Sequence, residues 1–217
     1  MHILRLVVLI SGQGSNMLAL ADAAKSDSSN FQLSAVIADT NAPGLTAAAR
    51  RGLTTGCVPR GDFATRADFE TALSMTIDRH DPDLIVLAGF MRVLSASFCQ
   101  RYAGQIINIH PSLLPDYKGL DTHRRVLAAG DAEHGCSVHL VTAELDDGPL
   151  LGQARLRVQP GEDEAELAVR VLELEHQLLP MVITRLAASR QEGSDALVSD
   201  AVIRDAGPLL LDATGAR

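Results

Sequence analysis

The chain has 217 residues, 47% of them hydrophobic, and a formal net charge of −8 at pH 7. This length and apolar content suffice for one α/β domain with a single buried core. The net negative charge disfavours a nucleic acid as partner, so any phosphate on a small ligand has to be held by a local group of donors.

The cysteines and the apolar segments argue against several other classes of protein. Cys57, Cys99 and Cys136 are odd in number and lack C-x-x-C spacing, which disfavours a disulfide framework and a zinc site. The apolar segment at residues 1–10 has no basic leader and no cleavage site, and no apolar run reaches the roughly 18 residues of a membrane span. We therefore expect a cytoplasmic protein that binds neither a metal ion nor a membrane.

Apolar runs of strand length alternate with segments of helical periodicity along the chain. This alternation is typical of a mainly parallel sheet with helices on both faces. The expected elements are strand 4–10, helix 16–25, strand 33–38, helix 45–51, helix 67–80, strand 84–88, helix 95–102, strand 105–109, helix 123–129, strand 136–141, strand 150–158 and helix 163–186. Because no helix separates strands 136–141 and 150–158, we expect them to form an antiparallel addition. We expect residues 1–190 to form one domain and 191–217 a C-terminal extension with a peripheral hairpin.

The first expected strand leads into a glycine-containing loop at residues 11–16, Ser-Gly-Gln-Gly-Ser-Asn, ahead of a helix. Free N–H groups at a helix start bind anions, and Ser15 and Asn16 can cap the helix or contact a phosphate oxygen. The same glycines also suit an ordinary strand-to-helix turn. A nicotinamide-binding loop is a third interpretation, although it needs a third glycine where the chain has Met17, and Asp39 is the only clean acid near the ribose distance.

Residues 106–111, Ile-Ile-Asn-Ile-His-Pro, are the most informative stretch of the sequence. Side chains alternate along a strand, so Asn108 and His110 share one face, and Pro111 ends the strand at the edge where open α/β sheets bind ligands. An amide and an imidazole aimed at one carbonyl oxygen stabilise the negative charge that develops during acyl or formyl transfer. The competing interpretation of His110 is a hydrogen-bonded structural histidine.

A carboxylate near His110 would let the imidazole carry a proton between an attacking amine and a leaving nitrogen. The candidates are Glu144, Asp146 and Asp147, which follow the expected strand at 136–141. Sequence spacing does not choose among the three, and an acidic loop before Gly-Pro is also typical of a solvent-exposed turn.

Four segments of the chain resemble the folate-dependent formyltransferase family and occur in the family's order. They are residues 8–16 (VLISGQGSN), 87–94 (LAGFMRVL), 108–115 (NIHPSLLP) and 135–148, which contains GCSVH and LDDG. Within the family, the chain is most similar to the enzymes that formylate glycinamide ribonucleotide. The resemblance implies a Rossmann-like formyltransferase fold. It also implies transfer of a formyl group from 10-formyltetrahydrofolate to the amine of glycinamide ribonucleotide in de novo purine biosynthesis.

The resemblance further implies roles for individual residues. As catalytic groups, Asn108 and His110 would polarise the formyl oxygen, with His110 as the proton donor and Asp146 as its carboxylate partner. The residues implied to bind glycinamide ribonucleotide are Gly14, Ser15, Asn16 and Glu175. The residues implied to bind the folate are Met91, Arg92, Val93, Leu94 and Asn108, with Arg66 near the folate tail.

The sequence leaves several alternatives open. Arg66 and Glu175 are also typical of exposed helix residues, and His139, inside an expected strand, is expected to be structural. A formyltetrahydrofolate deformylase is the nearest alternative activity. A nicotinamide-dependent oxidoreductase and a non-catalytic folate-binding protein are alternatives from other classes. The chain is expected to be a monomer or a homodimer, and the resemblance implies a cis peptide bond between Leu114 and Pro115.

Overall fold

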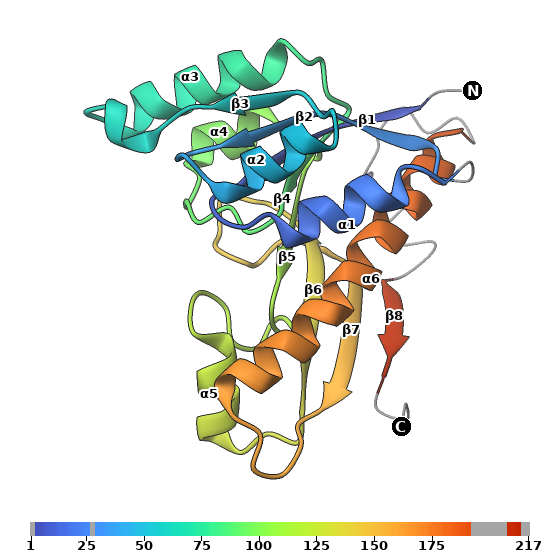
Figure 1. Cartoon of the computed structure of the whole chain (residues 1–217). Helices are drawn as coiled ribbons and strands as arrows, with labels where there is room; N and C mark the ends of the chain where they lie inside the picture. The colour runs from blue at the N-terminus through green and yellow to red at the C-terminus, as the bar shows by residue number, and fades with distance from the viewer. Residues whose placement is uncertain (1–2, 27–28, 192–207, 214–217) are drawn as a thin grey trace.

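A computed structural model describes residues 3–26, 29–191 and 208–213 of the chain. Its strands are β1 (Leu4–Ile10), β2 (Phe31–Ala38), β3 (Thr55–Cys57), β4 (Leu84–Leu87), β5 (Ile106–His110), β6 (Glu133–Leu140), β7 (Leu150–Arg157) and β8 (Leu209–Asp212). Its helices are α1 (Ser15–Ala23), α2 (Pro43–Arg50), α3 (Arg66–Asp78), α4 (Ala96–Arg101), α5 (Thr122–Ala129) and α6 (Glu164–Gln191), with a short 3-10 helix at Arg60–Asp62. The strands form one eight-stranded sheet in the order β3-β2-β1-β4-β5-β6-β7-β8 (Figure 1).

The sheet is parallel from β3 to β5, and β6 runs antiparallel to both of its neighbours. The expected antiparallel addition to a mainly parallel core is therefore confirmed. β8 pairs in parallel with β7 at the edge of the sheet. The strand order reverses direction between β1 and β4, and the helices that follow these two strands, α1 and α4, cover opposite faces of the sheet. Open α/β sheets bind their ligands at this kind of junction.

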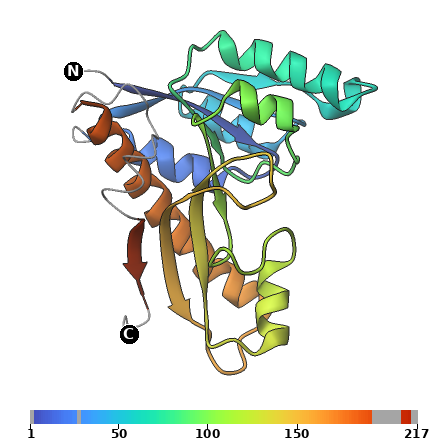
Figure 2. The same ribbon diagram turned by 180° about the vertical axis from the view of Figure 1, so that it is seen from behind.

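Side chains of β1 alternate between two apolar layers. Leu6 and Val8 pack in one buried cluster with residues of α1, α2, α5 and α6, whereas Val7 and Leu9 pack in a second cluster with α3 and α4. Figures 1 and 2 show these two sets of helices on opposite faces of the sheet. A strand that is buried on both faces has a continuous apolar sequence instead of an alternating one, which explains why every residue of β1 except the partly buried Arg5 is apolar.

Two parts of the chain, β3 and the end of α6, differ from the sequence-based expectation, and a third, the C-terminal segment, lies largely outside the described residues. β3 was not expected, because a three-residue strand that contains a glycine carries no periodic signal. α6 continues through Pro180 to Gln191, beyond the expected end at residue 186. Proline removes a backbone donor, but apolar side chains on both sides of Pro180 are buried and hold the helix in place. The expected C-terminal hairpin falls largely outside the described residues, of which 208–213 include the single strand β8.

Gly44, in the first turn of α2, packs against the loop after β1. Its N–H donates to the Gly12 carbonyl oxygen at 3.1 Å, and a Cβ at position 44 would lie 2.9 Å from that oxygen and 2.6 Å from Cδ1 of Ile10. We expect Gly44→Ala to displace the loop or the helix and to lower the free energy of unfolding by about 1–3 kcal/mol in a urea titration. Gly61→Ala is the matched control, because no heavy atom lies within 4 Å of its added Cβ. Equal stability of the two variants would contradict the close approach.

Candidate active site

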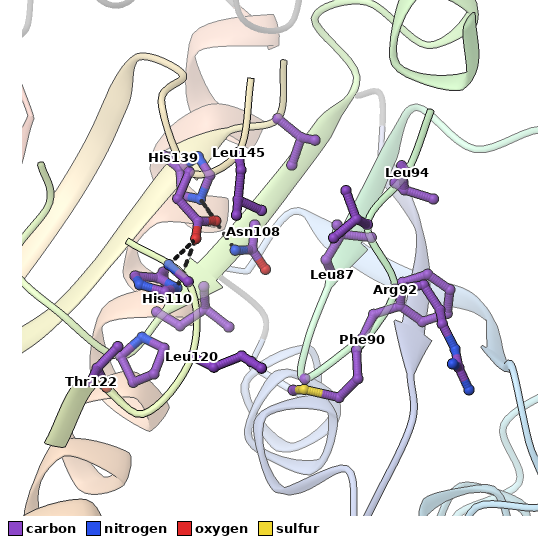
Figure 3. A pocket seen from close by; sticks show the side chains of 18 of the residues that line it. Leu87, Phe90, Arg92, Leu94, Asn108, His110, Leu120, Thr122, His139 and Leu145 are labelled. Atoms are coloured by element: carbon purple, nitrogen blue, oxygen red, sulfur yellow. Dashed lines mark hydrogen bonds and ion pairs between the residues drawn. The ribbon is translucent and has the colours of Figure 1, made fainter. Parts of the chain in front are cut away.

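A cavity of about 490 Å³ opens at the carboxyl edge of β4 and β5. It is lined by the loop after β4, by the end of β5 with the loop that follows, and by the loop between β6 and β7. Asn108 and His110 both face this cavity, as the alternation along the expected strand predicts. Figure 3 shows them on one wall, with Phe90, Arg92 and Leu94 on the other.

The carboxylate of Asp146 contacts groups from three segments of the chain. Its Oδ2 lies 3.6 Å from Nδ1 of His110 and accepts a hydrogen bond from the Gly119 N–H at 2.9 Å. Its Oδ1 lies 3.6 Å from Nε2 of His139. The backbone of Asp146 has a φ of 49°, a left-handed conformation that Asp tolerates better than most residues. This conformation belongs to the turn that points the carboxylate toward His110.

The structure distinguishes the three acidic candidates that sequence spacing left equivalent. Asp146 lies beside His110. Asp147, the next residue, forms an ion pair with Nζ of Lys118. Glu144 is exposed at the rim of the cavity. Asp146 is therefore the carboxylate in position to act with the imidazole.

His139 lies directly across the sheet from Asn108. The two residues are partners in the antiparallel ladder of β5 and β6, and Nδ2 of Asn108 is 3.1 Å from Nε2 of His139. The other ring nitrogen, Nδ1, is 2.8 Å from the Leu140 carbonyl oxygen, which only accepts, so Nδ1 carries the proton and Nε2 accepts from the amide. Burial lowers the pKa of His139, which keeps the ring neutral. His139 thus orients the Asn108 amide, a role that sequence reasoning missed.

The segment after β5 holds His110 from its other side. Nε2 of His110 donates to the Tyr117 carbonyl oxygen at 3.1 Å. Buried Ser137 on β6 anchors the segment, because its Oγ accepts from the Leu114 N–H at 3.0 Å. The peptide bond between Leu114 and Pro115 is cis, which confirms the sequence-based prediction.

The residues expected to bind a phosphate adjoin the cavity but are not part of its lining. Gly14, with a φ of 74°, is the N-cap residue of α1 and has no side chain with which to cap the first N–H groups of this helix. Ser11 connects the loop to the cavity: its N–H donates to the Gly89 carbonyl oxygen at 3.0 Å, and its Oγ accepts from the Met91 N–H at 2.9 Å. Ser15 begins α1 beside this junction. The loops after β1 and β4 therefore form one continuous edge.

Asn16 and Glu175 form a buried pair between α1 and α6. Nδ2 of Asn16 donates to Oε2 of Glu175 at 2.6 Å, and each residue is 7% exposed. Burial raises the pKa of Glu175 to about 7, although the hydrogen bond from Asn16 acts in the opposite direction. Glu175 is thus not an exposed helix residue, and the side chain of Asn16 is directed at Glu175.

The two arginines expected near the folate differ in their surroundings. Arg66, at the start of α3, is outside the cavity lining, and its Nε lies 3.8 Å from Glu70. Arg92 lines the cavity and forms an ion pair with Asp39, which follows β2 and is 1% exposed. Because Asp39 is engaged by Arg92, it is not free to bind a ribose, which argues against the nicotinamide interpretation.

Other functional features were sought across residues 3–26, 29–191 and 208–213. In these ranges, no group of three or more His, Cys, Asp or Glu side chains is placed to bind a metal ion. Cys57, Cys99 and Cys136 are free thiols. Among the helices of the same ranges, none has both the length and the apolar composition that crossing a membrane requires.

An open α/β sheet that gathers an amide, an imidazole and a carboxylate beside one cavity is typical of an enzyme of acyl or formyl transfer. The Formyl transferase family matches residues 4–183, and the chain belongs to this family. It is 45% identical over 188 residues to the phosphoribosylglycinamide formyltransferase of Escherichia coli K12, with 86% of this chain and 89% of that protein covered.

Solved structures of phosphoribosylglycinamide formyltransferases are also similar to this chain. The phosphoribosylglycinamide formyltransferase of Coxiella burnetii has a TM-score of 0.82 and 49% identity, covering 86% of this chain and 88% of that chain. The phosphoribosylglycinamide formyltransferase of Anaplasma phagocytophilum has a TM-score of 0.83 and 35% identity, covering 97% of this chain and 98% of that chain. The Rossmann-like formyltransferase fold expected from the sequence is therefore confirmed.

The buried Glu175 carboxyl is expected to make stability depend on pH. Its pKa is raised from 4.5 to about 7 in the folded protein. Between these pH values the carboxyl is protonated in the folded chain but ionised in the unfolded chain. The contribution of Glu175 to the free energy of unfolding therefore falls as the pH rises through this range. Glu175→Gln removes the charge at similar size. We expect the variant to exceed the native protein in stability by about 3 kcal/mol at pH 8, and this advantage to vanish near pH 4.5, in urea titrations.

Glu173→Gln, an exposed position on the same helix, is the control for that comparison. Because this side chain is exposed, the stability of the variant relative to the native protein should change by less than about 1 kcal/mol over the same range. An advantage of Glu175→Gln that stays constant from pH 4.5 to pH 8 would contradict the raised pKa.

Proposed function

We propose that the cavity and the adjoining loop after β1 bind 10-formyltetrahydrofolate and glycinamide ribonucleotide and transfer the formyl group to the amine. The chain is a formyltransferase of de novo purine biosynthesis. Its relatives are named for the transfer of a formyl group to phosphoribosylglycinamide, which is glycinamide ribonucleotide. The observation that carries the proposal is the convergence of Asn108, His110 and Asp146 on one wall of the cavity.

The proposed chemistry follows from the donors on that wall. Bound 10-formyltetrahydrofolate supplies the formyl group. Asn108 directs the N–H that His139 does not use at the formyl oxygen, and His110 adds a second donor, so both stabilise the charge that develops as the amine attacks the carbon. To reach this oxygen, His110 exchanges one of its present partners, the Tyr117 carbonyl or Asp146, for the substrate.

The proton that must move from the amine to the folate nitrogen gives His110 a second role and gives Asp146 its role. As the new C–N bond forms and the bond from the formyl carbon to the folate nitrogen breaks, the amine loses a proton and the folate nitrogen gains one. His110 carries this proton between the two nitrogens. Asp146, 3.6 Å from the imidazole, stabilises the positive charge that the ring bears during the transfer.

The surroundings of the cavity support the assignment of the two substrates. Met91 and Val93 are 65% and 61% exposed at the rim, apolar surface that the flat pterin would cover, and the backbone of residues 91–94 offers donors and acceptors to its edge. The exposed guanidinium of Arg66 is available to a carboxylate of the folate tail. For the ribonucleotide, the uncapped start of α1 suits the phosphate, and Glu175 suits the ribose hydroxyls.

The proposal extends to the organisation of the chain. Residues 1–190 form the formyltransferase domain and 191–217 a C-terminal extension that adds the edge strand β8 to its sheet; the family match at residues 4–183 supports this division. A cytoplasmic location is supported by the three free thiols. Both a monomer and a homodimer are compatible with a site built from residues of one chain.

The direct test is an assay with both substrates. The protein, 10-formyltetrahydrofolate and glycinamide ribonucleotide should yield tetrahydrofolate and formylated ribonucleotide in equal amounts, measured by absorbance and mass spectrometry. Release of tetrahydrofolate without the amine would instead indicate a deformylase. Tight folate binding without turnover would indicate a folate-binding protein.

Replacing the imidazole should separate turnover from binding. We expect His110→Ala to lower kcat by about 10²–10⁴-fold, the usual contribution of a general acid–base group. The dissociation constant for glycinamide ribonucleotide, measured by calorimetry, should stay within about twofold, because the proposed phosphate contacts come from a separate loop. Weak ribonucleotide binding by a folded His110→Ala protein would contradict this division of roles.

A further inference from the structure

The loop between β5 and α5 contacts both ionisable groups of the proposed site. The Tyr117 carbonyl oxygen accepts from Nε2 of His110 at 3.1 Å, and the Gly119 N–H donates to Oδ2 of Asp146 at 2.9 Å. The loop contains two non-glycine residues with positive φ, Tyr117 at 55° and Asp121 at 58°. Such conformations cost energy and persist only where neighbouring contacts support them. The position of both catalytic groups therefore depends on what holds this loop.

Arg125, an exposed residue of α5, contacts three residues of this loop and supports its conformation. Its Nη1 donates to the Lys118 carbonyl oxygen at 2.7 Å and to the Leu120 carbonyl oxygen at 3.3 Å. Its guanidinium carbon lies 5.2 Å from the centroid of the Tyr117 ring. Hydrogen bonds from a charged donor are stronger than neutral ones, and the stacking on the ring adds a cation–π attraction.

Arg125 and Asp146 bind the same peptide group from opposite sides. In a trans peptide, the carbonyl oxygen of residue 118 and the N–H of residue 119 point in opposite directions. The oxygen accepts from Arg125, while the N–H donates to Asp146. A positive charge at the oxygen polarises the peptide group and makes its N–H a stronger donor. Arg125 thereby strengthens the hydrogen bond that fixes the carboxylate beside His110.

We infer that Arg125 is a positioning residue for formyl transfer, orienting the peptide group between Lys118 and Gly119 so that its N–H holds Asp146 in place. This inference rests on the proposed function. Arg125 acts only through the loop and touches neither substrate. Its neighbour Arg124 offers a contrast, because it pairs with the exposed side chain of Asp121 at the far end of the loop, whereas Arg125 binds the carbonyl oxygen of Lys118 itself.

The test compares Arg125→Met and Arg125→Lys with Arg124→Met as the matched control. We expect Arg125→Met to lower kcat by about threefold to tenfold, the effect of one lost hydrogen bond, while both KM values stay within about twofold. Arg125→Lys should recover part of the loss, because an ammonium group replaces the charge but does not reproduce the planar fork of donors. Arg124→Met loses only an exposed ion pair with the Asp121 side chain, so it should keep kcat within about twofold of the native value.

A second readout does not depend on activity. In protein labelled with ¹⁵N-glycine, the Gly119 amide should exchange with solvent about threefold to tenfold faster in Arg125→Met than in the native protein or in Arg124→Met. Arg125→Lys should give an intermediate exchange rate, and it replaces Arg125→Met in both measurements if that variant does not fold.

The outcomes separate the inference from the function on which it rests. An unchanged Gly119 exchange rate in Arg125→Met overturns the inference, and so does faster exchange with an unchanged kcat. An equal fall of kcat in Arg124→Met overturns it too, because the effect would then come from the charge on α5. Absence of formyl transfer by the native protein contradicts the proposed function, and the exchange rates then still decide whether Arg125 orders the peptide.

Discussion

The contact between the Asp146 carboxylate and His110 is the interaction on which the site depends. Asp146 comes from the loop between β6 and β7, His110 from the end of β5, and the Gly119 N–H from the loop before α5. The carboxylate links both loops to the end of β5, and the ion pair between Lys118 and Asp147 beside it also joins the two loops. Its side chain is only 10% exposed, and a buried carboxylate requires donors around it. The contacts of the carboxylate with the Gly119 N–H and with His110 therefore hold the three segments close together beside one cavity.

The antiparallel strand β6 makes this arrangement accessible to the chain. Because β6 is antiparallel to β5, His139 is the direct cross-strand partner of Asn108. The loop that follows β6 then places Asp146 beside His110 at the end of β5. The return is tight: the Leu140 N–H donates to the Pro149 carbonyl oxygen at 2.9 Å, and a Cβ at Gly148 would lie 1.8 Å from the Leu140 oxygen. Glycine is thus required where the loop closes, and the fold supplies both the orientation of the amide and the approach of the carboxylate.

Local patterns of the sequence predicted the features that depend on local physics. The strand expected at residues 4–10 coincides with β1, and alternation along β5 correctly placed its amide and imidazole on one cavity wall. The continuation of α6 past Pro180 was missed, because tertiary packing there outweighs the local cost of proline. The choice of Asp146 and the role of His139 depend on a loop path and on cross-strand register, neither of which leaves a signal in the residues nearby. Residue patterns therefore predicted the polar character of the site, and the family resemblance alone indicated the pairing of Asp146 with His110.

The central claim is that Asp146 contributes to formyl transfer through His110. A double-mutant cycle of kcat/KM with Asp146→Asn and His110→Ala measures this coupling most directly. The account predicts strong non-additivity: adding Asp146→Asn to His110→Ala should cause little further loss, because the carboxylate no longer has an imidazole to act on. If the losses of the two single variants instead multiply in the double variant, the two groups act independently and the account is contradicted.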